Sequence, residues 1–455
     1  MAQNSGKFTT GATMRHVVVM TLTGSFGLMF MFLVDAAALF WVSQIGVAKL
    51  VAAMGFAWTI QFVTISVAIG LMIATTALVS RSLGAGARDE ARRQTSSAIL
   101  IATATQSIVA VAVYAFRHEI LYLSGAEGET HAIAAGFLAL SVPSLPLIAL
   151  SMACAATLRA MGDALRSMYI TLSAGLVAVF LDPFLIVTLG WGVDGAAIAI
   201  VISRGVSAAV GMWLLIRVHD MVARPDLAHA RRFAAPFFAV AGPSVLTQLS
   251  TPFGNYLVTY YVSGFGDSAV AGWAVIGRIM VLAFGGIFAL SGAIGGIIGQ
   301  NYGARKPDRI ASAYRDSAVF CLAYVAVVWL ILALSAQWIA GMFNLSGQGE
   351  IVAVVFLRYV AGSFVFVGAL FVANAAFNNL GRPLWSTGFN WLRDGILIAP
   401  LALLFADWFA APGVLYGQAA AGVIAGSLAY WVGWRFIRGL RLPDEAPELH
   451  ATRVR

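Results

Sequence analysis

Long apolar segments recur along the whole chain, and they restrict its fold more than any other feature. The first extends from Val17 to Ile45, and similar runs follow as far as residue 436, separated by short polar stretches. A helix needs about 20 apolar residues to cross the hydrocarbon core of a bilayer. Because lipid offers no partner for backbone N–H and C=O groups, helices are the structure that such runs can adopt there. The sequence therefore predicts an all-α polytopic membrane protein.

The composition supports twelve transmembrane helices. Of the 455 residues, 60% are hydrophobic and 11% are charged, and the mean hydropathy is +0.87. An ordinary soluble domain has roughly 25% charged residues. The predicted spans cover residues 15–45, 51–80, 95–116, 131–158, 167–190, 195–217, 235–263, 269–299, 315–340, 350–377, 384–408 and 413–436. No segment remains for a soluble domain.

The positive charges predict the orientation in the membrane. If the N-terminus is inside, most Lys and Arg residues, such as Arg88, Arg93 and Arg159, fall in cytoplasmic segments, and few fall outside. This asymmetry follows the positive-inside rule. We therefore expect both termini to be cytoplasmic, in the plasma or inner membrane of a bacterium or archaeon. The net charge of +8 then encodes orientation, and no nucleic acid is expected as a partner.

The two halves of the chain are similar at a constant shift of 219 residues. Residues 81–89 (RSLGAGARD) align with 300–308 (QNYGARKPD), and residues 158–167 (LRAMGDALRS) align with 377–386 (FNNLGRPLWS). Two separate matches at one shift indicate an internal duplication. We predict two six-helix lobes, residues 1–220 and 221–455, related by a pseudo-two-fold axis along the membrane normal. Such repeats place substrate between the lobes and work by alternating access.

Asp35 and Asp182 are the candidate ion-coupling residues. Asp35 lies within the first apolar run, and a charge at the bilayer centre costs about 2.5–3.5 kcal/mol even on the lenient insertion scale. Counted from the cytoplasmic anchors, Asp35 stands about 30 Å and Asp182 about 24 Å into the membrane. Two carboxylates at similar depth can share a proton or bind a monovalent cation. Since Asp35 aligns near Gly254 and Asn255, the ionisable chemistry is predicted to lie in the first lobe.

Other polar groups at membrane depth have two open interpretations. Uncharged polar residues of the second lobe either line the substrate cavity or hold helices together. Buried arginines need carboxylate or carbonyl partners, and Asp394 is expected to pair with Arg278 or Arg393. Met and aromatic side chains of the first span suit an apolar cation. The candidate substrate-contacting residues are Met31, Phe32, Gln248, Asn255, Tyr256, Tyr260, Arg278, Asn374 and Asn378.

The sequence offers little support for an enzyme. At membrane depth there is no His, Ser or Cys nucleophile with a base, and no cluster with metal-ligand spacing. We expect no catalytic residue, no metal site and no organic cofactor. The major facilitator class also has twelve spans, but its Asp-Arg-rich motif between the second and third spans is absent, and GAGARDEARR is not that pattern.

Several motifs together resemble the multidrug and toxic compound extrusion (MATE) transporters, in particular the DinF-like branch. The similarity covers nearly the whole chain, and the order and spacing of the motifs carry it. The motifs are LVDAAALFWVSQIG at 33–46, ALVSRSLGAGARDEARR at 77–93, TLRAMGDALRS at 157–167, LDPFLI at 181–186, GVDGAAIAIVISR at 192–204 and IGQNYGARKPDRIASA at 298–313.

This resemblance implies export of organic cations and drugs in exchange for inward H+ or Na+, with Asp35 and Asp182 as the coupling acids. Family members described as Na+-binding have an asparagine and a threonine where this chain has Ala178 and Ile200. Because a hard cation needs several oxygen ligands, this departure favours H+. Na+ coupling and a lipid-linked oligosaccharide flippase remain the alternatives. We expect a monomer in contact with membrane lipids.

Overall fold

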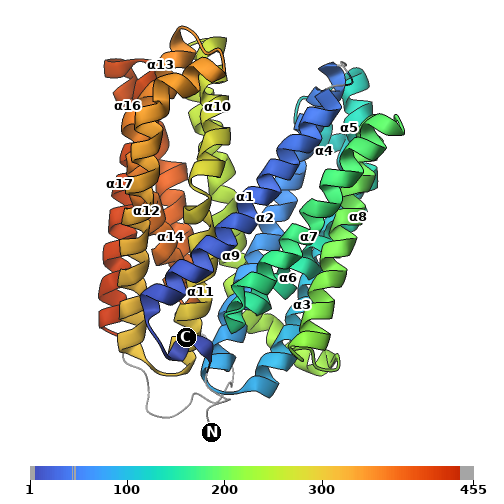
Figure 1. Cartoon of the computed structure of the whole chain (residues 1–455), viewed down its shortest axis with the longest axis vertical. Helices are drawn as coiled ribbons and strands as arrows, with labels where there is room; N and C mark the ends of the chain where they lie inside the picture. The colour runs from blue at the N-terminus through green and yellow to red at the C-terminus, as the bar shows by residue number, and fades with distance from the viewer. Residues whose placement is uncertain (1–5, 44, 46–47, 441–455) are drawn as a thin grey trace.

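The computed structural model describes residues 6–43, 45 and 48–440, and the side chain of Asp35 lies outside the described part. Regular structure in this part is helical throughout (Figure 1). The first half forms α1 (Thr13–Ser43), α2 (Ala48–Gly84), α3 (Arg88–Ala115), α4 (Arg117–Leu123), α5 (Gly128–Ser141), α6 (Leu145–Met161), α7 (Ala164–Pro183) and α8 (Gly192–Trp213). The second half forms α9 (Leu227–Ser263), α10 (Asp267–Ala283), α11 (Gly285–Gly303), α12 (Pro307–Met342), α13 (Gln348–Val355), α14 (Phe364–Asn379), α15 (Pro383–Trp391), α16 (Ile398–Phe409) and α17 (Ala411–Arg438).

Short 3-10 and π-helical turns join some of these helices into longer spans. They are η1 (Lys7–Thr9), η2 (Val142–Ser144), η3 (Phe184–Thr188), η4 (Leu214–Val218), η5 (Phe356–Val360), η6 (Ala361–Ser363) and η7 (Leu392–Leu397). Within the described residues, eleven spans are long and apolar enough to cross a membrane, and the bent pair α10–α11 makes the twelfth. The twelve predicted spans are therefore confirmed.

The eighth predicted span is broken, which the hydropathy pattern did not indicate. Helices α10 and α11 meet at an angle of 45°. The hydroxyl of Tyr324 stands in for the interrupted backbone bonds: it donates to the carbonyl of Ala283 (2.9 Å) and accepts from the N–H of Gly286 (3.3 Å). A side chain that inserts into the backbone ladder is a recognised cause of a kink. A Cβ at Gly286 would overlap the Tyr324 ring, so this break requires glycine.

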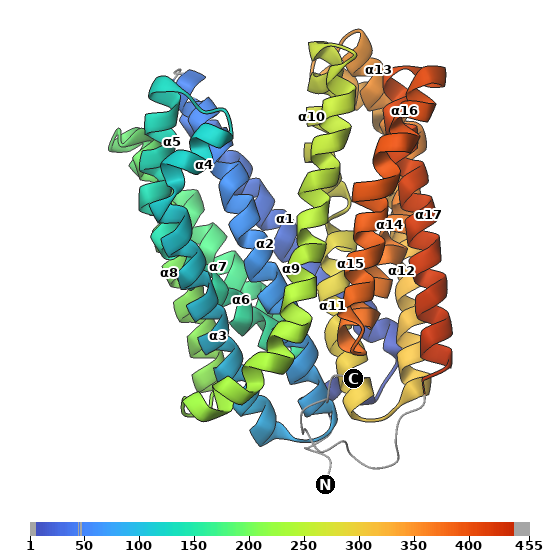
Figure 2. The same ribbon diagram turned by 180° about the vertical axis from the view of Figure 1, so that it is seen from behind.

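The helices form two lobes that converge at one end and diverge at the other (Figures 1 and 2). The convergent end is where α1 begins and α17 ends. The first helix of each half crosses to the opposite lobe. Val17 and Met20 of α1 are buried in the apolar core of the second lobe with Phe284, whereas Phe233 and Phe237 of α9 are buried among residues of α2 and α3. The lobes are therefore interlocked by exchanged helices.

Helices α2 and α11 pack against each other at the convergent end. A Cβ at Gly84 would overlap the backbone of Gln300, and a Cβ at Gly303 would overlap the backbone of Arg81. These four residues form two pairs at the shift of 219, since Arg81 corresponds to Gln300 and Gly84 to Gly303. We call this contact the seam. Each contact is the symmetry mate of the other, as a pseudo-two-fold axis through the seam requires.

Hydrogen bonds around the seam obey the same symmetry. Arg81 Nε donates to the carbonyl of Asn379 (3.0 Å), and Gln300 Nε2 donates to the carbonyl of Ala160 (2.6 Å). Ala160 and Asn379 again correspond at the shift of 219. The duplicated sequence therefore makes duplicated contacts between the lobes.

The N-terminal segment closes over the seam. Phe8 is 1% exposed, and its N–H donates to Gln300 Oε1 (2.8 Å). Lys7 Nζ donates to the carbonyl of Gly162 in the first lobe (2.8 Å), while Arg309 Nη2 of the second lobe donates to the carbonyl of Phe8 (2.8 Å). The segment thus binds both lobes and stabilises their contact at the convergent end.

A buried ion pair stabilises the second lobe. Arg393 Nε and Nη2 donate to the two carboxylate oxygens of Asp394 (2.7 and 2.8 Å), and Ser250 Oγ of α9 donates to Oδ2 (3.0 Å). Sequence neighbours do not face each other on a regular α-helix. Here both residues lie in the π-helical turn η7, which lets them pair. Of the two predicted partners, Asp394 therefore binds Arg393, whereas Arg278 is exposed on α10.

We predict that Gly84→Ala destabilises the protein by about 1–3 kcal/mol, because the added methyl group forces α2 and α11 apart. Thermal unfolding of the purified protein in detergent measures this. Gly55→Ala is the matched control, because it lies on the same helix with no heavy atom within 4 Å of its Cβ position. Equal melting temperatures for the two variants would contradict the close packing at the seam.

We also predict that Arg393→Met costs about 3–5 kcal/mol, because it leaves the buried Asp394 carboxylate uncompensated. The double variant Arg393→Met, Asp394→Asn removes both charges and should recover most of that loss. Thermal unfolding of the two variants and the native protein tests this. If the double variant is as unstable as the single one, the pair does not act as a coupled unit.

Candidate functional site

Helices α1 and α7 run parallel and in close contact in the first lobe. The Cβ position of Gly27 lies 3.2 Å from Met168 Cγ, and that of Gly175 lies 3.2 Å from Val34 Cγ2. Further along, Val42 of α1 shares a buried apolar cluster with Ile186, which follows α7. The small residues therefore set a register in which residues 34–42 of α1 accompany residues 175–186.

Both candidate acids belong to this paired stretch. Asp35 directly follows Val34, and its backbone is helical; nothing further is described for it. Asp182 is near the end of α7 and is 3% exposed. Pro183 follows it and has no backbone N–H, and the chain continues into the π-helical turn η3. Such turns are frequent at functional sites.

A buried arginine network lies in the same lobe. Arg204 Nη2 donates to Gln61 Oε1 (2.7 Å), and Nη1 donates to Ser144 Oγ (2.9 Å); Gln61 Nε2 in turn donates to Ser141 Oγ (3.1 Å). The sequence placed Arg204 at membrane depth, but it gave no sign of these partners. They come from α2, α5 and η2, which only the folded chain brings together.

Packing of α8 against α7 gives the depth of Arg204. Gly195 of α8 lies against the backbone of Leu185, and Gly211 lies against the side chain of Ile170, so the two helices are antiparallel. Arg204, midway between the two glycines, is thus level with the middle of α7, close to Gly175. The first lobe therefore holds a permanent positive charge near the depth of Asp35, which directly follows the contact of Val34 with Gly175.

The second lobe also has a carboxylate at the corresponding place, contrary to the prediction that ionisable chemistry lies in the first lobe. Gly254 is the counterpart of Asp35 at the shift of 219, and its Cβ position is 2.9 Å from Asp394 Oδ1. The carboxylate comes from η7 rather than from α9, so comparison of the repeats missed it. Because Asp394 pairs with Arg393, the two charges beside Gly254 sum to zero. Asp35 lies at the equivalent position in the other repeat.

The remaining candidates separate into exposed and buried groups. Asn255, Tyr256 and Tyr260 are exposed on α9, and the two tyrosine rings stack with centroids 6.4 Å apart. Met31 is exposed on α1, and Phe32 and Gln248 are half-buried. These residues are available for contact, and a role in substrate binding stays a prediction.

Asn374 and Asn378 of α14 are buried instead. Asn390 Nδ2 donates to Asn374 Oδ1 (3.0 Å), and Ser386 Oγ donates to Asn378 Oδ1 (3.0 Å). These bonds join α14 to α15. Of the two roles open to the polar residues of this lobe, the structure favours holding helices together for these two.

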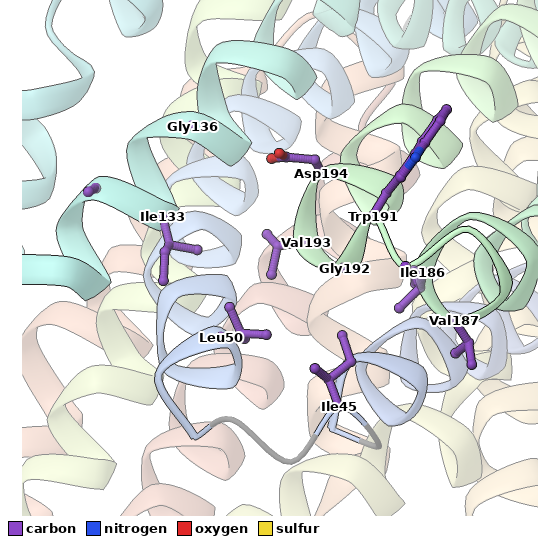
Figure 3. A pocket seen from close by; sticks show the side chains of 12 residues that line it. Ile45, Leu50, Ile133, Gly136, Ile186, Val187, Trp191, Gly192, Val193 and Asp194 are labelled. Carbon is purple, nitrogen blue, oxygen red and sulfur yellow. The ribbon is translucent and has the colours of Figure 1, made fainter.

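A pocket of about 730 Å³ opens at the divergent end of the first lobe, away from the seam (Figure 3). Its walls are mainly apolar and include Ile45, Ile133 and Val193. Asp194 extends toward the helix of Ile133, while Trp191 points away from the other lining side chains. Among the residues whose side chains the structure describes, neither Asp182 nor any predicted substrate-contacting residue lines this pocket.

Comparison with known proteins identifies a family model and solved structures that match this chain. The MatE family model matches residues 25–184 and 243–404. The crystal structure of a mutant of the Vibrio cholerae MATE transporter VcmN superimposes with a TM-score of 0.88, at 26% identity, over 93% of this chain and 96% of that chain. An outward-facing MATE transporter structure of the MOP superfamily has a TM-score of 0.89 at 22% identity, over 95% and 98% of the two chains.

Relatives with assigned activities are transporters. A protein named "FAD transporter" from Shewanella oneidensis is 26% identical over 427 residues, which are 92% of this chain and 94% of the relative. The multidrug export protein MepA of Staphylococcus aureus is 23% identical over 347 residues, 74% and 75% of the two chains. The chain therefore belongs to the MATE (MatE) family of multidrug and toxic compound transporters, which are membrane proteins and not enzymes.

Proposed function

We propose that this protein exports amphipathic organic compounds, organic cations among them, in exchange for inward protons. The observation that carries the proposal is the burial of Asp182 on α7 beside the stretch of α1 that contains Asp35. An acid at membrane depth is by default part of an ion or substrate pathway. A buried carboxylate can change its charge by taking up a proton, which couples it to a pH gradient.

Alternating access explains how the two lobes would work. With the predicted orientation, the convergent end is cytoplasmic and the structure corresponds to a state open to the outside. The seam and the N-terminal segment seal the cytoplasmic side in this state. Inward opening separates Gly84 from Gln300 and Gly303 from Arg81, and rotation about the pseudo-two-fold axis breaks both contacts together.

Helix α1 links protonation of the acids to movement of the lobes. Its beginning is buried in the second lobe through Val17 and Met20, and its middle packs on α7 of the first lobe through Val34. When a proton neutralises Asp35 or Asp182, the electrostatic balance beside α1 changes. Because α1 touches both lobes, a rearrangement of this helix shifts one lobe against the other and releases the bound compound to the outside.

Two features favour H+ as the coupling ion. Ala178 lies one turn before Asp182 and provides no side-chain oxygen, and neither does Ile200 on α8. Na+ needs several oxygen ligands, whereas a proton needs one carboxylate. Arg204 also supplies a fixed positive charge near the depth of Asp35, which opposes binding of a second cation there. Na+ coupling is therefore the less favoured alternative, and so is the oligosaccharide flippase.

A second substrate class has a specific observation in its favour. The relative named "FAD transporter" aligns with 92% of this chain, more than the 74% that aligns with MepA. FAD is an aromatic compound with a negatively charged diphosphate. We therefore include aromatic phosphate compounds among the candidate substrates.

We predict that Asp35→Asn and Asp182→Asn each lower proton-driven transport by about tenfold or more, because neither side chain can then exchange a proton. Efflux of ethidium from proteoliposomes with an imposed pH gradient measures this. The exposed residue Asp407 on α16 gives the control Asp407→Asn, which should keep native activity. Full activity of the Asp35→Asn variant would refute the proposal.

We further predict that a pH gradient without Na+ drives transport by the purified protein, because Ala178 and Ile200 offer Na+ no side-chain oxygen beside Asp182. A Na+ gradient with a protonophore present should produce no uptake above background. Proteoliposomes loaded with the same dye allow both gradients to be compared in one preparation. Transport driven by the Na+ gradient alone would show that the coupling ion is Na+ and not H+.

A further inference from the structure

Arg159 has few hydrogen-bond partners among the described residues around the seam. It lies in the last turn of α6, where Nη1 donates to Ser167 Oγ (3.1 Å) and Nη2 approaches Met72 Sδ (2.7 Å). Its Nε is buried and has no hydrogen-bond partner among the described residues. A thioether is a weak acceptor, and a guanidinium remains charged at every physiological pH. Arg159 is therefore a cation with no anionic partner among the residues that the structure describes.

The other arginines at membrane depth show how such a charge is usually satisfied. Arg393 has the carboxylate of Asp394, and Arg204 has the oxygens of Gln61 and Ser144. Arg81, also at the seam, donates to two backbone carbonyls and lies over the Tyr302 ring. No described carboxylate lies within ion-pair distance of Arg159. The difference indicates that an external anion completes its surroundings.

On the proposed alternating-access mechanism, Arg159 also lies on the path of a transported compound. Gly296 of α11 packs against its backbone carbonyl, and the Cβ position of Gly292 is 3.9 Å from its Nε. The next residue, Ala160, makes the seam contact with Gln300. Because side chains on a helix tilt toward its N-terminus, the guanidinium lies on the divergent side of the seam. The sequence had placed Arg159 in a cytoplasmic loop; the structure places it between the lobes.

The glycines of α11 leave the space in front of the guanidinium without a side chain. A larger residue at position 292 would extend toward Nε. Arg159 as a whole is half-buried, but its Nε is shielded from solvent in this state. Separation of α11 from α6, as inward opening requires, would expose the guanidinium from the cytoplasmic side.

We propose that Arg159 binds the phosphate group of anionic substrates and is a specificity-determining residue of this transporter. This inference rests on the proposed export function and assigns one substrate class to it. A guanidinium can hold two phosphate oxygens at once, and Nε and one Nη form the edge suited to that geometry. The phosphate group of the substrate binds when the lobes are separated at the cytoplasmic side. It is carried outward when the seam closes on the cytoplasmic side of the bound substrate.

The test compares a flavin that carries an anionic diphosphate, joined to adenosine, with a flavin that carries none. FAD and riboflavin share the flavin ring, but only FAD is anionic. Binding of each to the purified protein in detergent, followed by quenching of flavin fluorescence without any ion gradient, is independent of coupling. Arg159→Gln should weaken FAD binding by about tenfold or more and leave riboflavin binding within twofold. Arg159→Lys should fall between, since ammonium keeps the charge but not the two-point geometry.

Transport provides the second readout. In proteoliposomes with a pH gradient, Arg159→Gln should raise the KM for FAD by a similar factor and leave ethidium efflux within twofold. Arg231→Gln removes an exposed cytoplasmic arginine and should change neither substrate. Efflux of ethidium also shows that the variant is folded.

The outcomes separate this inference from the proposed function. Equal losses for FAD and ethidium, or no loss for either, would overturn the phosphate site, because a merely structural arginine acts on both substrates alike. Failure of the native protein to bind FAD would also overturn it, even if ethidium is exported by the pH gradient. FAD binding that depends on Arg159 without any response to the gradient would support the site and refute proton coupling.

Discussion

The arrangement of the lobes depends on the backbone contact between α2 and α11. Glycine at the end of each helix lets the other approach until backbone meets backbone, and small residues commonly allow such contacts between membrane helices. Neighbouring helices pack on these two: α6 and α9 pack on α2, while α1 and α14 pack on α11. Because both glycines belong to the repeat, the pseudo-two-fold axis passes through this contact.

The charges depart from this symmetry. At the seam, Arg81 corresponds to Gln300, and Arg159 corresponds to Asn378. The first repeat therefore supplies cations where the second supplies neutral amides. Further out, the first repeat carries Asp35 on α1, and the second carries a carboxylate that Arg393 neutralises. At these equivalent positions, the charges without a charged counterpart in the other repeat therefore belong to the first repeat, where a change of protonation or substrate would act on one side of the axis.

Hydropathy and repetition were sufficient to predict the helical membrane fold, the twelve spans and the pairing of the halves. They work because burial of apolar residues in lipid and contact at a duplicated glycine are properties of local sequence. The division into residues 1–220 and 221–455 stays a prediction. It also simplifies the packing, since α1 and α9 each contact the opposite lobe. The break at Phe284 depends on the hydroxyl of Tyr324, which belongs to another helix. A hydropathy profile does not show contacts between residues that are distant in sequence.

The candidate site was less accessible to sequence reasoning. Asp35 and Asp182 were found because a lone acid in an apolar run is unusual, but the partners of Arg204 and the packing of Asp394 on Gly254 come from distant segments. Arg159 was hidden for a different reason. It is two residues from the end of α6, so charge counting assigned it to a loop. An arginine at a helix end extends back along the helix, and its guanidinium can occupy membrane depth that its sequence position does not suggest.

Helix α1 is where the symmetric framework and the asymmetric charge meet. Both α1 and α9 cross between the lobes, so either could transmit motion, but only α1 carries an acid, since Gly254 stands at the equivalent place on α9. Val17 and Asp35 are about 27 Å apart along α1. On the proposed coupling, a shift of α1 near Asp35 is transmitted along the helix to the contacts of Val17 and Met20 in the second lobe. The proton therefore acts through the one exchanged helix that carries an acid and reaches the opposite core.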